Sequence, residues 1–202
     1  MKLAIFIDYD NLLERHKSAG ILDVATKALM QTPISDQPVR GTCDIRIYGG
    51  WYEGPTMTQR AQDLSVAIAN DFPAIIRVPR KNGGVVALAT NAELAVAMME
   101  EPNHLLFGTY RKKGKPGNLR VLSPAEVGCT EAACPLPLAK KLLKSGKCPT
   151  SSCSVMADDL VYRHEQKIVD TMLACDMIYS PTQDYQHLIL ISDDDDFLPP
   201  LR

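Results

Sequence analysis

The chain has 202 residues, a formal net charge of −2 and 46% hydrophobic residues, which is typical of one globular domain, with or without an insertion. This small net charge excludes a basic field over the whole molecule, so any attraction of nucleic acid must come from local patches. No apolar run approaches the roughly 20 residues that span a bilayer, and Asp8 interrupts the short apolar start, so we expect no membrane span and no secretory leader. We therefore predict a cytoplasmic protein whose six cysteines are reduced or bound to metal.

The first half of the chain alternates strand-like and helix-like segments. We predict a buried strand over residues 3–8, a helix from about Asn11, a strand over 43–48, a helix over 56–71 and a strand over 72–79. Residues 91–101 are interpreted as a further helix. Strands that alternate with helices indicate an α/β domain with a mostly parallel sheet.

The second half begins differently. Two strand-like runs within residues 104–122 flank the basic segment 111–117, which predicts a β-hairpin with a basic tip. A helix over about 160–178 and a last strand over 187–192 follow. The remaining residues allow a helix of about two turns with Asp196 as its N-cap. We expect the sheet edge to be completed by chain beyond Arg202, by a protein partner or by a second copy.

Carboxylates follow both the first and the last predicted strand. Asp8, Asp10 and Asn11 end the first, and the run Asp193 to Asp196 follows the last. Parallel neighbours would present these groups at one rim of the sheet, where open α/β sheets bind ligands. Crowded carboxylates raise each other's pKa unless a cation neutralises them, and hard oxygen ligands select Mg²⁺ or Mn²⁺. A solvated turn with a helix cap is the alternative for the acidic run, but it does not explain Asp8.

Three motifs, in this order along the chain, resemble those of NYN domains, a branch of the PIN-like nuclease superfamily. The matching stretches are Phe6-Ile7-Asp8-x-x-Asn11-Leu12, then Lys167-Ile168-Val169-Asp170 with Asp176 six residues on, and Ser192-Asp193-Asp194-Asp195-Asp196-Phe197. The last resembles the S-G-D-x-D-F motif of that family, although Asp193 stands where the family usually has Gly. The stretch from about 80 to 155 has no counterpart in the family.

The resemblance implies a PIN-like three-layer α/β fold over residues 1–202, with a mostly parallel central sheet and an insertion at about 80–155. It implies a hydrolase that cleaves phosphodiester bonds, of RNA rather than DNA, with Mg²⁺ or Mn²⁺ activating water. The catalytic groups and metal ligands carried over from the family are Asp8, Asp170, Asp194 and Asp196. The supporting residues are Asn11, Asp10, Asp176, Ser192 and Asp193.

Four cysteines form two pairs with equal internal spacing. Cys129 and Cys134 are separated by four residues, as are Cys148 and Cys153. Such pairs predict a structural zinc site over residues 129–153, in which four thiolates leave no open catalytic position. Unrelated cysteines or disulfides are the alternatives, and disulfides do not suit a chain without a secretory leader. The remaining Cys43 and Cys175 lie in apolar contexts and are expected in the core.

Basic residues gather in two places inside the predicted insertion. Each group alone is typical of a solvated loop, but both lie between the halves of the predicted nuclease centre, where they could contact a phosphate backbone. Tyr110 and the pair Trp51-Tyr52 are candidates for stacking on bases, or else for packing. The candidate nucleic-acid-binding residues are Arg111, Lys112, Lys113, Lys115, Arg120, Lys140, Lys141 and Lys144.

Two other functions fit parts of the pattern. Asp8 and Asp10 after an apolar strand also resemble the nucleophile motif of haloacid-dehalogenase-like phosphatases, with Asp8 forming an aspartyl-phosphate and Asp10 acting as general acid. However, Leu12 stands where that family prefers Thr or Val. A non-catalytic nucleic-acid-binding or assembly module with the same fold is the third hypothesis. Single Asp8→Asn or Asp194→Asn changes would separate it from an enzyme.

Overall fold

The computed structural model describes residues 1–32, 40–80, 83–116, 119–129 and 133–201. The chain divides into two compact units. The first unit combines Met1–Tyr110 with Gln166–Arg202, and the second unit is Arg111–Glu165. In the described ranges, no helix combines the length and the apolar character needed to cross a lipid bilayer.

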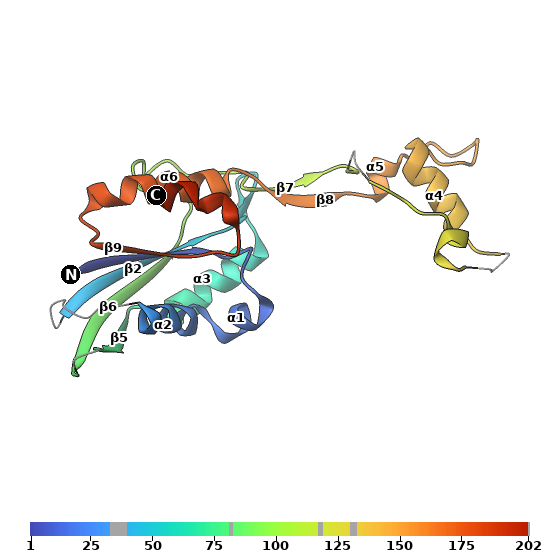
Figure 1. The fold of residues 1–202 in the computed structure, drawn as a ribbon. Helices are drawn as coiled ribbons and strands as arrows, with labels where there is room; N and C mark the ends of the chain where they lie inside the picture. The colour runs from blue at the N-terminus through green and yellow to red at the C-terminus, as the bar shows by residue number, and fades with distance from the viewer. Residues whose placement is uncertain (33–39, 81–82, 117–118, 130–132, 202) are drawn as a thin grey trace. The chain divides into compact units, whose positions relative to one another are not determined.

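The first unit is built on a five-stranded sheet with the strand order β5-β6-β2-β1-β9 (Figure 1). Neighbouring strands are parallel except for β5, which is antiparallel to β6. This confirms the α/β class and the mostly parallel sheet. The strands are β1 (Lys2–Asp8), β2 (Arg40–Tyr48), β5 (Ala74–Pro79), β6 (Val85–Leu94) and β9 (His187–Ile191). Two short strands, β3 (Tyr52–Glu53) and β4 (Thr56–Met57), form a separate antiparallel pair.

Helices cover both faces of this sheet (Figure 1). One face carries α1 (Glu14–Ala19), α2 (Ile21–Gln31) and α3 (Gln59–Asp71), and the other carries α6 (Val169–Tyr179). The 3₁₀ turns of this unit are η2 (Ser180–Gln183), η3 (Asp195–Phe197) and η4 (Pro199–Leu201). Helix α3 begins where the Thr58 side chain accepts a hydrogen bond from the amide of Ala61, as an N-cap residue does.

The side chains of β1 explain the three layers. Successive residues of a strand point to opposite faces. Leu3, Ile5 and Ile7 pack in the core cluster that includes α2 and α3 residues. Ala4 and Phe6 pack with α6 in a second cluster. Because β1 is apolar on both faces, it must lie inside the sheet, and this parity directs Asp8 to the α6 face.

The second unit contains smaller elements. Strand β7 (Tyr110–Lys113) pairs with β8 (Arg163–Gln166). Each of these strands contains one of the two positions at which the chain passes from one unit to the other. Between these strands lie η1 (Pro124–Val127), α4 (Leu136–Ser145) and α5 (Ala157–Leu160). Helix α4 ends at Gly146, whose φ of 78° is the left-handed conformation that glycine adopts without steric cost.

The structure corrects the predicted hairpin over residues 104–122. The partner of β7 is β8, which lies about fifty residues later in the chain, and residues 119–123 are in neither a helix nor a strand. Residue 118, which was predicted to begin the second strand, lies outside the described residues. The second unit also begins later than the predicted insertion at about 80–155, because residues 85–94 belong to the central sheet.

Two predicted helices also differ. Residues 91–101 do not form a helix, since β6 continues to Leu94, and its residues 91–94 pair with β2. This pairing overrides the helical propensity of the alanine and glutamate in that stretch. The predicted helix over 160–178 begins only at Val169, because β8 occupies part of its first half. At the C-terminus the N-cap of η3 is Asp194, not Asp196.

A buried charge network fastens α6 to the sheet. Asp176 is fully buried and accepts hydrogen bonds from the hydroxyl of Tyr48 at 2.8 Å, the guanidinium of Arg46 at 3.1 Å and the amide of Met99 at 2.8 Å. The desolvated hydroxyl of Tyr48 has a pKa raised above its usual value, mainly by burial, so it stays a donor. Three donors from three segments therefore satisfy one carboxylate.

Replacing Asp176 with Ala should destabilise the first unit by about 3–5 kcal/mol, because it leaves the Arg46 charge without its buried partner. Asp176→Asn keeps the shape and should cost less. Urea unfolding followed by circular dichroism measures both, with Thr171→Ala at an exposed position of the same helix as control. An Asp176→Ala protein as stable as the control would show that the network does not hold the helix.

Candidate functional site

The site lies where the strand order of the sheet reverses. From β1 the chain moves to β2 on one side, and it returns at the end to β9 on the other side. Ile7 pairs with Ile191 in the parallel register, so the next residues, Asp8 and Ser192, lie beside each other at the carboxyl ends of both strands. Open α/β sheets bind ligands at such a switch point.

Asp8 is the centre of this site. Its side chain is 1% exposed, and Oδ2 accepts hydrogen bonds from Nδ2 of Asn11 and from Oγ of Ser192, both at 2.7 Å. Within the part of the chain that the structure describes, the buried Oδ1 has no hydrogen-bond partner. A buried carboxylate oxygen without a partner is unfavourable by about 1–3 kcal/mol or more. The two bonds on Oδ2 fix the direction in which the unsatisfied oxygen points.

The acidic run is folded back toward Asp8 by its own hydrogen bonds. Oγ of Ser192 accepts a bond from the amide of Asp194 at 3.1 Å, while Oδ1 of Asp194 accepts one from the amide of Asp196 at 2.9 Å. Phe197 is buried in the cluster on the α6 face and anchors the end of the run. Ser192 thus links the start of this loop to Asp8.

Asp170 belongs to the same electrostatic cluster. It lies in the first turn of α6, on the face of the sheet to which Asp8 points, and Nε2 of Gln166 lies 3.4 Å from its Oδ1. Partial removal from water raises the pKa of Asp170, and the negative charges of Asp8, Asp194, Asp196 and Asp10 raise it further. Asp170 therefore lies near enough to the other three acids that the family resemblance implies as ligands for their charges to act on it.

These acids are close, but they do not converge on one point. Across the described ranges, no group of three or more His, Cys, Asp or Glu side chains is placed to hold a metal ion. Carboxylates that repel one another are held apart unless a cation offsets their charge. The donor set itself suits Mg²⁺ or Mn²⁺, since it consists of oxygen atoms and includes the unsatisfied Oδ1 of Asp8.

Three of the predicted supporting residues have partners or neighbours other than Asp8. Asp10 binds Arg60 through an ion pair and accepts a hydrogen bond from the amide of Gly50 at 3.2 Å, so it ties β1 to α3. Asp176 lies in the buried network with Arg46. Asp193 is exposed and lines a cavity of about 240 Å³ with its neighbours in the run. The contact from Arg60 was missed, because no spacing links it to Asp10.

The predicted zinc ligands all lie in the second unit. Cys148 and Cys153 are neighbours, and the pKa of the Cys148 thiol is lowered by hydrogen bonds from the Thr150 backbone and then from Cys153. Cys129 and Cys134 line a common cavity of about 500 Å³. Each pair is thus brought together, but the described residues do not bring both pairs to one point. The core assignment of Cys43 is confirmed, because this residue is fully buried, whereas Cys175 is only half-buried. Burial, with a smaller effect of Asp44, raises the pKa of Cys43 to about 12.

The predicted basic residues are only partly available for a ligand. Glu165 pairs with Arg111, Lys113 and Arg163, and Nζ of Lys115 donates to the carbonyl of Leu143 at 2.8 Å. Lys112 lies over the ring of Tyr162 at 3.8 Å. In contrast, the cavity next to Cys129 and Cys134 is lined by Lys140, Lys141 and Lys144, and Arg120 is exposed.

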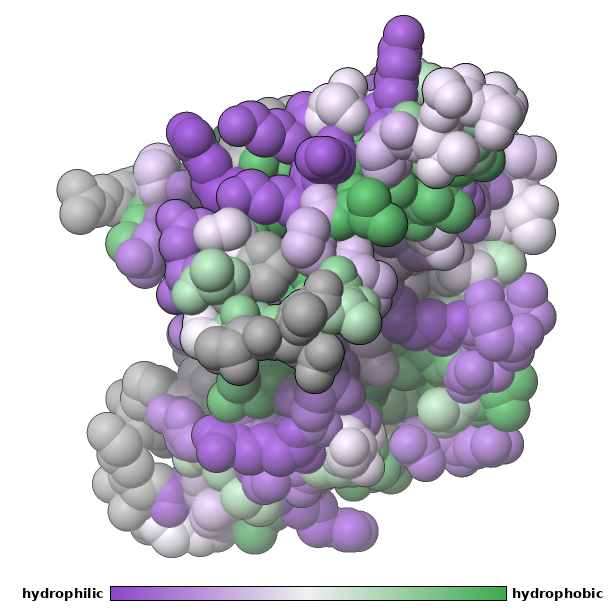
Figure 2. All heavy atoms as spheres, turned by 90° about the vertical axis from the view of Figure 1, so that its right-hand side faces the viewer, coloured by the Kyte–Doolittle hydropathy of each residue, from purple (hydrophilic) through white to green (hydrophobic). Residues whose placement is uncertain are grey.

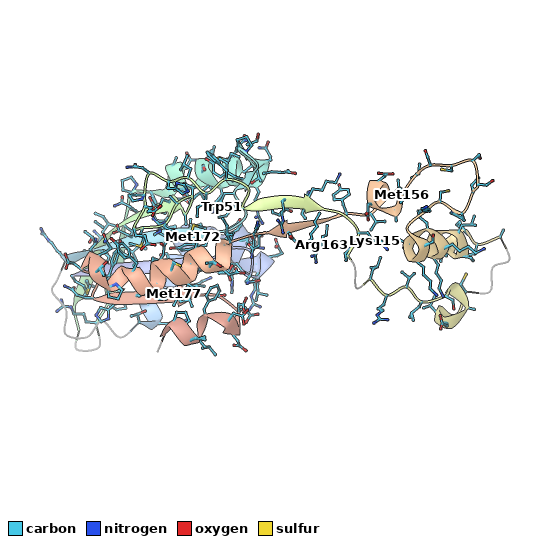
Figure 3. All side chains as sticks on the ribbon, turned by 90° about the horizontal axis from the view of Figure 1, so that it is seen from above. Trp51, Lys115, Met156, Arg163, Met172 and Met177 are labelled. Carbon is cyan, nitrogen blue, oxygen red and sulfur yellow. The ribbon has the colours of Figure 1, made fainter. Side chains whose placement is uncertain are left out.

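Hydrophilic side chains cover much of the face that Figure 2 presents, with apolar ones in smaller groups. Figure 3 identifies Lys115 and Arg163 among the side chains of the second unit and Trp51 in the first. Trp51 is fully buried and donates to the carbonyl of Ile47, so it packs in the core and is not a stacking platform. Tyr52 and Tyr110 are half-buried.

Comparisons with known proteins identify no relative of this chain. No protein-family model matches it, no curated protein matches it, and no solved structure matches it. The geometry around Asp8 is therefore the basis for its functional interpretation.

Replacing Asp170 with Asn should stabilise the metal-free protein at neutral pH, because it removes one charge from a repelling cluster. The folded-state pKa of Asp170 is raised, so its ionisation opposes folding. This gain in stability should therefore vanish as the pH falls below 3.8, the pKa of the carboxyl group in the unfolded chain. Because Asp170 is exposed, we expect the gain in stability to be about 1 kcal/mol or less.

Thermal unfolding in EDTA across this pH range measures the effect. Added Mn²⁺ should then stabilise the wild type more than the variant, which lacks one ligand. A variant that is less stable than the wild type in EDTA, or that gains equally from Mn²⁺, would contradict this account of the cluster.

Proposed function

We propose that the protein is a metal-dependent nuclease of the PIN-like superfamily, in its NYN branch, that hydrolyses phosphodiester bonds of RNA. The observation that carries this proposal is the carboxylate of Asp8. It is buried at the switch point of the sheet, one oxygen is fixed by Asn11 and Ser192, and the other has no partner among the described residues. A divalent cation at that oxygen would satisfy it.

In this proposal Asp8, Asp170, Asp194 and Asp196 hold Mg²⁺ or Mn²⁺. When bound, the ion supplies a hydroxide nucleophile near neutral pH and stabilises charge on the attacking and leaving oxygens. Asn11 and Ser192 orient the carboxylate of Asp8, and the backbone bonds within the acidic run position Asp194. The carboxylates act as ligands and need not form covalent intermediates.

In this proposal the second unit has two roles, since it would hold a structural zinc ion and would contact nucleic acid. We propose that Cys129, Cys134, Cys148 and Cys153 hold one structural Zn²⁺, since both pairs already lie in one small unit. Closing a four-thiolate site would order this unit, whose helix α4 has no buried residue. Lys140, Lys141 and Lys144, on α4, would then face phosphates of the substrate.

The phosphatase alternative is less consistent with the surroundings of Asp10. As general acid, Asp10 would have to carry a proton and face the leaving group. Instead both oxygens of its carboxylate are already engaged, Oδ1 by Arg60 and Oδ2 by the amide of Gly50. A non-catalytic nucleic-acid-binding module would fit the fold equally well, but it gives no reason for the unsatisfied oxygen of Asp8.

Purified protein should cleave labelled single-stranded RNA in Mn²⁺ and lose this activity in EDTA. Asp8→Asn should reduce the rate at least about 10²–10³-fold, the scale expected when one electrostatic contact to the reacting centre is lost. Asp184→Asn, an exposed change at the end of η2, is the matched control and should cleave RNA like the wild type.

The same assay separates the alternatives. Beryllium fluoride should leave cleavage of RNA unchanged, whereas it would trap Asp8 in a phosphatase. If Asp8→Asn cleaves RNA as fast as the wild type, the nuclease proposal is wrong. If wild-type protein binds RNA without cleaving it in any divalent metal, the binding module is the better hypothesis.

Metal analysis should find about one zinc per chain, as a single four-thiolate site requires. Cys148→Ser should lower the zinc content and expose the remaining thiols to a thiol reagent, whereas Cys175→Ala, outside the cysteine pairs, should not. Zinc well below one equivalent, with all four thiols reactive in the wild type, would refute the site.

A further inference from the structure

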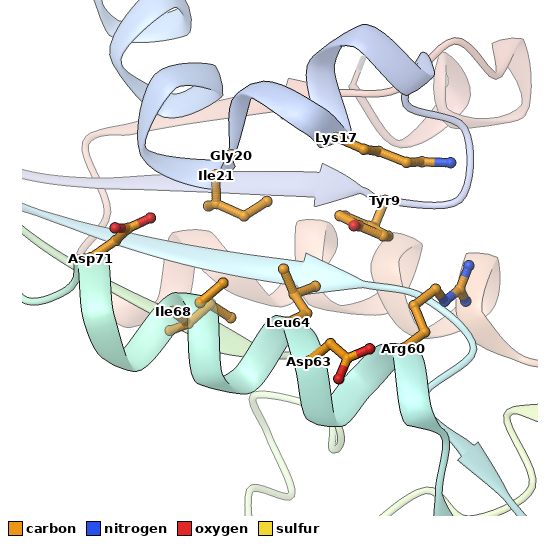
Figure 4. Close-up of a pocket in the computed structure, with 10 residues that line it drawn as sticks. Tyr9, Lys17, Gly20, Ile21, Arg60, Asp63, Leu64, Ile68 and Asp71 are labelled. Atoms are coloured by element: carbon orange, nitrogen blue, oxygen red, sulfur yellow. The ribbon is translucent and has the colours of Figure 1, made fainter.

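A second cavity lies beside the candidate site, on the opposite face of β1. It has a volume of about 460 Å³ and lies between α3 and the α1–α2 segment. Its apolar lining includes Ile21, Leu64 and Ile68, which lie along the groove in Figure 4. This volume is within the range of small-molecule sites, which are mostly apolar with a few polar groups that fix the ligand's orientation.

The two cations of this pocket lie at one end. Lys17, from α1, and Arg60, from α3, lie on either side of Tyr9 in Figure 4, while Asp71 lies at the far end of the groove. Nζ of Lys17 is 5.6 Å from the centre of the Tyr9 ring, and Cζ of Arg60 is 5.8 Å from it. Tyr9 therefore holds the two cations near each other at this end of the pocket through cation–π contacts.

Both cations retain hydrogen-bonding capacity. Lys17 uses two bonds, to Glu14 at 2.9 Å and to the carbonyl of Asp10 at 3.4 Å, out of the three that an ammonium group can donate. Arg60 binds Asp10 and, at 3.4 Å, the carbonyl of Gly50, and a guanidinium has five N–H donors. A phosphate could therefore bind without displacing the existing partners.

The cationic end is continuous with the candidate catalytic site. Tyr9 directly follows Asp8, and both cations contact Asp10, two residues beyond Asp8. The parity of β1 places Asp8 on the α6 face, whereas Tyr9 packs on the cluster of the opposite face. A strand of nucleic acid that crosses the carboxyl edge of the sheet at Asp8 would thus meet this pocket next.

We infer that this pocket binds one nucleotide unit of the nucleic-acid substrate, with the base on the apolar floor and the phosphate near Lys17 and Arg60. The assignment rests on the proposed nuclease function. Ile21, Leu64 and Ile68 provide the apolar surface on which the base can pack. Lys17 and Arg60 fix the phosphate, so the unit next to the scissile bond is positioned from both ends.

The acidic residues of the pocket argue for a nucleotide over a simple anion. Asp63 and Asp71 line the same groove, and carboxylates repel a bare phosphate. Ionised carboxylates only accept hydrogen bonds, and base edges carry N–H donors that can satisfy them. A ligand with a negative end at Lys17 and Arg60 and a donor-bearing base elsewhere matches this arrangement of charges.

Binding of guanosine 5′-monophosphate to full-length protein in EDTA tests the assignment without requiring turnover. Amide resonances of Gly20, Ile21 and α3 should shift on titration, and ribose 5-phosphate and inorganic phosphate should bind at least tenfold more weakly. Ala67→Trp, which fills the exposed edge of the groove, should weaken nucleotide binding at least tenfold. Val66→Trp, at a 62% exposed position outside the pocket, is the matched control and should bind like the wild type.

Equal binding of ribose 5-phosphate and the nucleotide would overturn the assignment, because it would show an anion site without a base site. So would unchanged binding by Ala67→Trp, or shifts confined to other parts of the chain. The nuclease proposal is judged separately by RNA cleavage. If RNA is cleaved and the nucleotide does not bind here, only the pocket assignment is wrong. If the nucleotide binds and RNA is not cleaved, only the nuclease proposal is wrong.

Discussion

The carboxylate of Asp8 is the constraint on which the rest of the site depends. A strand that is apolar on both faces must be central in the sheet, and it places the charged group that ends it in a buried position. Asn11 and Ser192 satisfy one oxygen of this group and leave the other without a partner among the described residues. Leaving a buried charge in this state is unfavourable, so the folded chain is most stable when something positive completes the site.

Strand parity separates the roles of two nearby acids. Asp8 points to the face covered by α6, where Asp170 and the acidic run add negative charge. Asp10, two residues on, has already left the strand and binds Arg60 of α3. One acid is therefore left in a repelling cluster while the other is neutralised. Asp8 is therefore a candidate metal ligand, whereas Asp10 makes a structural contact. The ion pair of Asp10 also brings the cationic end of the pocket with Lys17 and Arg60 next to the acidic site.

The sequence predicts the parts of this arrangement that depend on local pattern. The apolar runs that end at Asp8 and Ser192 identify two strands, and the structure confirms that they are parallel neighbours. The first strand is buried as predicted, whereas β9 is only half-buried. Long-range pairing was not predictable in the same way. Residues 91–94 have helical propensity but extend β6 by pairing with β2, and β7 pairs with a segment that local spacing cannot identify. The burial of Asp176 also depends on a tertiary contact, with Arg46, that no spacing indicates.

Diffraction from a crystal grown with Mn²⁺, with anomalous scattering to locate the ion, tests the central claim most directly. The account predicts a manganese ion bound to Oδ1 of Asp8, with carboxylates of Asp170 and of the run after β9 drawn in to share it. An ion bound elsewhere, with Oδ1 of Asp8 still unpartnered or satisfied by a protein donor, would contradict the claim that this buried oxygen is a metal ligand.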